Sequence, residues 1–226
     1  MTFFEIIGKV FTYTMVHDTI KASVPIVLAC MCAVISRQVD INNIAAEGII
    51  MFSAFFAVLV SYYTGSWVLA VLTGVLLGVL VSAFMATAYL KYHVNIFVVG
   101  LCINMMGPAC TRFLLQVVLK TSGNFVSEKM VPISTINFSF LNSSPVLKSL
   151  FSGYTVTEWL VVPLVILLWF MLYKSVWGLR LRAVGLNEMA AYTSGIDIDQ
   201  KKMTALLLSG AFAGLAGAHL SLGYSC

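Results

Sequence analysis

Charged residues are scarce in this sequence of 226 residues. Asp, Glu, Lys and Arg together make up 10% of the chain, whereas soluble domains carry roughly 25%. Only nine residues are acidic, and the mean hydropathy is +0.97. This shortage of polar surface excludes soluble enzyme folds, disordered chains and nucleic-acid-binding modules. We therefore expect a multi-pass membrane protein with lipid, and no nucleic acid, as its surroundings.

Features of disulfide, metal and nucleotide chemistry are also missing. The cysteines lie in or at the edges of apolar runs, so they are interpreted as small buried hydrophobic residues and not as a disulfide framework. Cys30 and Cys32 project from nearly opposite sides of a helix, which argues against a metal site. The chain contains no GxxxxGK[ST] loop, so any ATP hydrolysis belongs to another polypeptide. We predict no enzyme activity, metal or cofactor for this chain.

Long apolar runs are abundant. A bilayer core of roughly 30 Å needs about 20 apolar residues per helix. The runs are continuous and do not alternate with period two, so they indicate helices and not barrel strands. The predicted fold is all-α: a single transmembrane domain over residues 1–226, built as a helical bundle of about six spans. The spans are expected at residues 19–36, 44–62, 66–89, 94–116, 157–177 and 203–223.

Basic residues set the expected orientation in the cell membrane. Segment 178–202, with Lys174 just before it, is rich in Lys and Arg, and basic residues near span ends mark the cytoplasmic side. Segment 117–156 and the N-terminus then face outward. Residues 1–17 lack the basic start and small-residue cleavage site of a signal peptide, so we expect an interfacial helix there.

Small residues recur at every fourth position in two predicted spans. Such stripes let helix backbones approach closely in lipid, where no hydrophobic force drives association. The stripes indicate a compact bundle without indicating its task. The glycines expected at packing positions are Gly74, Gly78, Gly210, Gly214 and Gly217.

Two polar residues lie inside predicted spans and are the candidates for a substrate pathway. Glu47, in NIAAEGIIM, and Asn104, in GLCINMMG, should each face protein or a water-filled cavity. Glu47 could instead pair or cap near the cytoplasmic end of its helix. An interhelical hydrogen bond is the alternative for Asn104.

The segment GLRLRAVGLNEMAAYTSGIDIDQKKM predicts a short helix outside the membrane. Asn187 is a suitable N-cap, Glu188 suits the positive end of the helix dipole, and Gly195 can adopt the left-handed conformation that ends the helix. Asp197 or Asp199 can then cap the last span. Because a helix of about two turns is marginal alone, we expect it to dock against another protein.

Three stretches resemble the inner-membrane permease subunits of ATP-binding cassette (ABC) importers. The resemblance is to the branch serving nucleosides and simple sugars, which is related to the ribose and branched-chain amino-acid permeases. The stretches are DINNIAAEGIIMFSAF, VNIFVVGLCINMM, and LRAVGLNEMAAYTSGI followed by SGAFAGLAGAHL. The third is similar to the family's cytoplasmic coupling helix, with Met189 inserted after the glutamate. The matching positions are Glu188, Ala190, Ala191 and Gly195.

The resemblance implies a permease subunit that moves nucleosides or simple sugars across the cell membrane. Its implied partners are an ABC ATPase subunit that binds the ATP, a second permease subunit in a homo- or heterodimer, and an extracytoplasmic substrate-binding protein. Substrate would cross between the two permease subunits. Members of the family continue through further spans where this sequence stops at Cys226, so the chain is expected to be shortened at its C-terminal end.

Other interpretations of the sequence remain open. A secondary transporter or channel also needs a polar-lined bundle, although no internal repeat is visible and Pro25 and Pro108 are single breaks. An intramembrane hydrolase would need Ser209 and His219, which lie about 80° apart around one helix. An inactive, truncated permease paralogue would keep all of these features.

Overall fold

The computed structural model describes residues 13–120, 131–136 and 153–224. Six of its helices are long and apolar enough to cross a membrane, which confirms the predicted all-α multi-pass fold. They are α2 (Tyr13–Arg37), α3 (Ala46–Thr64), α4 (Trp67–Leu90), α5 (Ile96–Val118), α7 (Val156–Tyr173) and α10 (Ile198–His219). In the described residues, strands are limited to β1 (Thr135–Ile136) and β2 (Tyr154–Thr155), which pair antiparallel.

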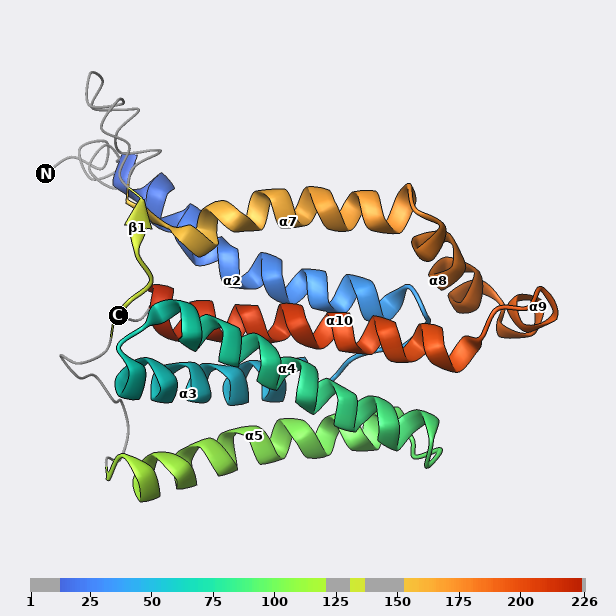
Figure 1. Cartoon of the computed structure of the whole chain (residues 1–226), viewed down its shortest axis with the longest axis horizontal. Helices are drawn as coiled ribbons and strands as arrows, with labels where there is room; N and C mark the ends of the chain where they lie inside the picture. The colour runs from blue at the N-terminus through green and yellow to red at the C-terminus, as the bar shows by residue number, and fades with distance from the viewer. Residues whose placement is uncertain (1–12, 121–130, 137–152, 225–226) are drawn as a thin grey trace, which may run out of the picture.

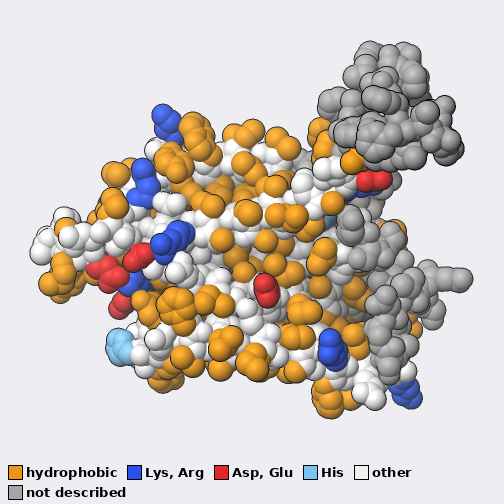
Figure 2. Space-filling model, turned by 180° about the vertical axis from the view of Figure 1, so that it is seen from behind, with side chains coloured by type: hydrophobic (Ala, Val, Ile, Leu, Met, Phe, Trp, Pro, Cys, Tyr) orange, Lys and Arg blue, Asp and Glu red, His pale blue; other side chains and the backbone are white. Residues whose placement is uncertain are grey.

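The long helices lie side by side, with α10 inside the bundle (Figure 1). α10 packs against α4, α2 and α3, while α5 covers α3 and α7 covers α2. The outward faces are apolar: on α4, side chains four residues apart are each more than half exposed, namely Leu72, Leu76, Leu80 and Phe84. Most charged side chains visible in Figure 2 gather at one end of the apolar body. A continuous apolar flank with a charged end is the surface expected of a protein that spans a bilayer.

Helix boundaries differ from the prediction mainly near the charged end. α10 begins at Ile198, five residues before the predicted span, and α7 ends at Tyr173. Segment 178–202 holds two helices in place of one, α8 (Val176–Leu186) and α9 (Glu188–Thr193). α8 forms because Ser175 accepts a hydrogen bond from the Gly178 amide at 3.1 Å, which caps a new helix directly after α7.

At the end of the bundle away from the charged end, the predicted interfacial helix 1–17 and the predicted segment 117–156 lie partly outside the described residues. α2 extends back to Tyr13, so the last residues of the expected interfacial helix belong to a span. The rest of that helix, and most of segment 117–156, lie outside the described residues. The chain continues after α10 as a short π-helix, Leu220–Tyr224.

Glycine contacts set the spacing between α10 and its neighbours. A Cβ atom on Gly78 would overlap the Gly210 carbonyl oxygen and lie 2.7 Å from the Gly214 Cα. Gly74 lies against Ala218 and the Gly214 carbonyl. On the next face, a Cβ on Gly217 would lie 3.0 Å from the Ala54 nitrogen of α3. Since only glycine fits at these crossings, α3 and α4 contact α10 almost backbone to backbone.

The described cysteines differ in exposure, and Cys110 is half-buried. Cys32 is buried, while Cys30 and Cys102 are exposed on the outer faces of α2 and α5. The interpretation as buried residues therefore fails for Cys30 and Cys102, because both lie on the outward side of a peripheral helix.

Candidate functional site

The connection between α2 and α3 runs back into the bundle before α3 begins (Figure 1). The Asn43 side-chain amide donates a hydrogen bond to Ser209 Oγ at 2.9 Å, and Ser209 lies midway along α10. Ser209 in turn donates to the Cys32 carbonyl oxygen at 2.9 Å. Ile41 and Ala45 are buried on either side of Asn43. The first turn of α3 therefore lies inside the bundle and not at its end.

Asn104 of α5 holds the irregular backbone that precedes α3. Its Nδ2 donates to the Ile44 carbonyl oxygen at 2.7 Å, and its Oδ1 accepts from the Gly48 amide at 2.7 Å. The N-cap residue of α3, Ala45, offers no side-chain cap. Unpaired backbone groups are costly inside a membrane, so Asn104 supplies the partners that the helix start lacks.

We expect Asn104→Leu to destabilise the bundle by about 1–3 kcal/mol, because it leaves the amide of the buried Gly48 and the Ile44 carbonyl without their side-chain partner. Thermal unfolding of the purified protein in detergent measures this loss. Asn95→Leu is the matched control, since Asn95 caps the exposed start of α5 through the Phe97 amide, where water can replace it. Equal stabilities of the two variants would contradict the role given to Asn104.

Glu47 lies in the first turn of α3 and is exposed on the bundle surface. It forms no hydrogen bond or ion pair with the part of the chain that the structure describes. Large exposed hydrophobic side chains just before α3 and on α3 and α5 share this region: Ile44, Met51, Leu101 and Met105. An ionised carboxylate at this depth cannot face lipid without a cost of several kcal/mol, so this face must meet water or another subunit.

At the charged end, the chain forms the short helix that the sequence predicts. Asn187 accepts a hydrogen bond from the Ala190 amide at 3.1 Å, so it is the N-cap of α9. Gly195 has φ +77°, the left-handed conformation that glycine adopts at low cost. Asp197 then accepts from the Gln200 amide at 3.0 Å and caps α10. Asn187 and Gly195 thus fix where α9 begins and ends, and Asp197 fixes where α10 begins.

The end of α8 and the following helix α9 present large apolar side chains to the solvent. Leu186, Met189 and Tyr192 are 88%, 76% and 69% exposed. Of the positions that match the coupling helix of the permease family, Ala191 is buried against the rest of the chain, while Ala190 and Gly195 are exposed. Glu188 does not stand free: its Oε1 lies 2.7 Å from the Nζ of Lys202. Sequence reasoning used Lys202 only to orient the chain and missed this pair.

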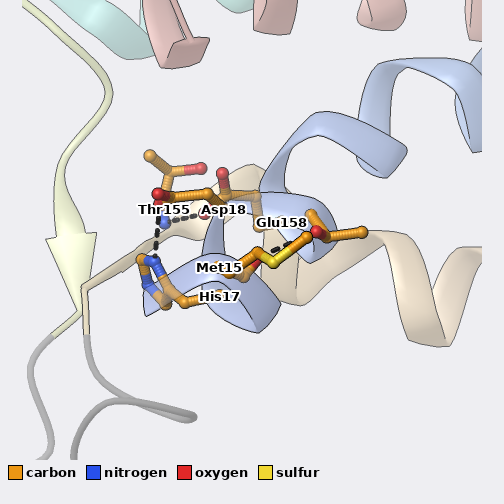
Figure 3. A network of polar contacts seen from close by, with 6 residues as sticks. Met15, His17, Asp18, Thr155 and Glu158 are labelled. Carbon is orange, nitrogen blue, oxygen red and sulfur yellow. Dashed lines mark hydrogen bonds and ion pairs between the residues drawn. The ribbon is translucent and has the colours of Figure 1, made fainter. Parts of the chain in front are cut away.

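At the opposite end, the starts of α2 and α7 lie close together, with polar side chains from both (Figure 3). Thr155 and Glu158 form a capping box, and the His17 ring lies 4.6 Å from the Tyr154 ring. Burial, together with the negative charges of Glu158 and Asp18, raises the pKa of the Tyr154 hydroxyl. These contacts fasten the helix ends to one another.

The geometry disfavours a hydrolase. His219 Nδ1 lies 2.7 Å from the Thr157 hydroxyl, at the far end of α10. Ser209 is engaged by Cys32 and Asn43, ten residues earlier in the same helix. That separation corresponds to about 15 Å along the helix axis, so the two side chains cannot act as nucleophile and base.

Comparisons with known proteins agree with this architecture. Residues 15–226 match the family model described as "Branched-chain amino acid transport system / permease component". The nucleoside ABC transporter permease protein NupC of Lactococcus lactis subsp. cremoris is 33% identical over 204 residues, which are 87% of this chain and 63% of the relative. The guanosine ABC transporter permease protein NupQ of Bacillus subtilis is 31% identical over 211 residues, 89% of this chain and 65% of the relative.

A third relative comes from an archaeon. The putative glucose ABC transporter permease protein TsgC13 of Haloferax volcanii is 27% identical over 219 residues, 95% of this chain and 64% of the relative. The chain thus spans less than two thirds of the length of each of these relatives. No solved structure gives a significant match.

Proposed function

The chain belongs to the family of permease components of the branched-chain amino acid transport system, and on this basis we propose that it is the permease subunit of an ABC importer. Three observations support this function: the bundle of six candidate spans, the relatives named as ABC transporter permeases, and a capped helix beyond the spans. The names of these relatives favour nucleosides or simple sugars as substrates. A secondary transporter or channel is not favoured, because the relatives belong to ATP-driven systems.

The exposed face of α9 is the single observation that carries the proposal. A two-turn helix is marginally stable alone, and its apolar side chains are unfavourably exposed to water. Burying them against a partner lowers the free energy and stabilises the helix. We place this face on the cytoplasmic side, where it docks against the ATPase subunit that binds ATP. The substrate-binding protein meets the opposite end. Motion of the ATPase then reaches the spans through α9 and α10.

Tyr192→Asp should weaken retention of the ATPase subunit on the purified permease. Aromatic residues at the centre of an interface contribute about 2 kcal/mol or more, which corresponds to roughly 30-fold weaker binding. Co-purification from membranes, quantified by mass spectrometry, measures the change.

Tyr63→Asp is the matched control for this experiment. Tyr63 is 65% exposed, close to the 69% of Tyr192, but it lies at the opposite end of the bundle. The control should retain the ATPase. If Tyr192→Asp retains it equally well, α9 is not the docking element.

The pathway is proposed to run along the face that carries Glu47. A second permease subunit facing α3 and α5 would enclose this carboxylate together with the water that it needs. Asn104 is partly exposed beside it and fixes the start of α3. Asn104 therefore shapes the pathway wall, and Glu47 is the side chain available to accept hydrogen bonds from substrate hydroxyl groups.

A further inference from the structure

Lys202 joins three helices at the charged end of the bundle. It lies in the second turn of α10 and is 6% exposed. Its Nζ lies 2.7 Å from Glu188 Oε1 of α9 and 3.4 Å from the Tyr89 hydroxyl of α4. The same ammonium stands 5.5 Å from the centroid of the Tyr89 ring, within cation–π range. A lysine is rarely buried to this extent unless it is paired.

Lys202 also separates two hollows in the surface. One, of about 530 Å³, lies between the α4–α5 turn and α10 and includes Tyr89. The other, of about 790 Å³, lies under α9 and includes Glu188 and Tyr192. Lys202 lines both hollows, and Ala191 is the buried residue of α9, so side-chain packing holds α9 to the bundle through a small contact.

The backbone joining α9 to α10 adds limited restraint. Ser194 ends α9, and Gly195 turns the chain in the left-handed region with no atom near its Cβ position. A hydrogen bond from the Ile196 amide to the Ala191 carbonyl, at 3.1 Å, closes this turn. Beyond the turn, the Lys202–Glu188 ion pair links α9 to α10 in addition to the packing of the buried Ala191.

We propose that Lys202 is a positioning residue that holds α9 to α10 and α4 through Glu188 and Tyr89, so that Glu188 acts inside this chain and is not a contact to the ATPase. The inference rests on the proposed function. It reassigns the glutamate that the resemblance places at the docking surface, and it leaves Met189 and Tyr192 as the docking side chains.

The same contacts connect α9 with the face of α3 that carries Glu47. α10 carries Lys202 at one end and Ser209 midway, where Ser209 holds Asn43 just before α3. Gly217 places α10 directly against the backbone of α3. A displacement of α9 is therefore passed through Lys202 to α10 and on to the turn of α3 that bears Glu47.

The test uses the assembled transporter with its ATPase and binding protein in proteoliposomes. Lys202→Met keeps the length of the side chain and removes its charge, and Glu188→Gln removes the partner charge. We expect both variants to retain the ATPase, and to transport at least about fivefold less substrate per ATP hydrolysed, the lower end of typical allosteric couplings. Lys202→Arg should retain coupling. Lys201→Met is the matched control, because it loses the same charge one residue away without losing an ion pair.

The double variant makes the test independent of folding losses. If Glu188 acts through its ion pair with Lys202, Glu188→Gln with Lys202→Met couples no worse than Lys202→Met alone. Two results would overturn the inference: wild-type coupling in Lys202→Met, or loss of the ATPase in Glu188→Gln but not in Lys202→Met. Failure of the wild-type chain to retain any ATPase would instead reject the proposed function.

Discussion

Gly210→Ala is expected to destabilise the bundle by about 3 kcal/mol or more, the upper range for overpacking a close interface. The added Cβ would overlap Ser82 Oγ and lie 2.5 Å from the Gly78 carbonyl oxygen. Neither α4 nor α10 can move away easily, because α10 also contacts α2 and α3. Thermal unfolding in detergent, together with the yield of monodisperse protein, measures the effect.

Gly100→Ala serves as the matched control for this prediction. Gly100 is also a helix glycine facing another part of the chain, but the nearest atoms to its Cβ position, Ala45 N and Ile44 Cβ, are 3.3 Å away. This variant should lose much less stability than Gly210→Ala. Similar unfolding temperatures for both would show that the α4–α10 crossing has more room than the structure gives it.

Glu47→Gln is expected to lower substrate uptake by roughly ten- to a hundredfold, since a hydrogen bond to a charged group contributes about 1.5–3 kcal/mol. Retention of the ATPase should not change, because Glu47 lies far from α9 along the bundle. Uptake of radiolabelled nucleosides and sugars by proteoliposomes measures the loss. Normal uptake would remove Glu47 from the pathway.

Measuring whether water reaches position 47 distinguishes a substrate pathway from a lipid-facing surface. A cysteine at position 47 should react with a charged, water-soluble thiol reagent in membranes, in a background without the native cysteines. A cysteine at Leu76, which is 60% exposed on the apolar face of α4, should not react. Equal protection of both positions would place Glu47 against lipid or within a dry contact.

Features that depend on neighbouring residues in the sequence could be predicted. The spans follow from apolar length alone, and α9 follows from local capping chemistry at Asn187, Gly195 and Asp197. The Asn187 and Asp197 side chains each accept from the backbone amide three residues later, and Gly195 supplies the left-handed turn between them, so the local sequence contains the information needed. α8 was missed because Arg180 and Arg182 made the segment resemble a charged loop, although Ser175 offered a capping signal.

Features that depend on distant residues could not be predicted. Asn43 and Ser209 are 166 positions apart, and no local pattern shows that the chain turns back before α3. Asn104 was singled out as polar, but its partners are backbone atoms of Ile44 and Gly48, which side-chain patterns do not reveal. Lys202 directly follows Lys201 in the polar start of α10, so the sequence does not distinguish the two lysines, and the pairing of Lys202 with Glu188 depends on how α9 folds back.

Photocrosslinking from position 189 in intact cells tests most directly whether α9 is the point at which a separate ATPase acts. Met189 is 76% exposed at the outer surface of this helix, so a photoreactive residue there should not disturb the bundle. The account predicts a covalent adduct with the ATPase subunit, lost when Tyr192 is also changed to Asp. An adduct with an extracytoplasmic protein, or with lipid alone, would contradict it.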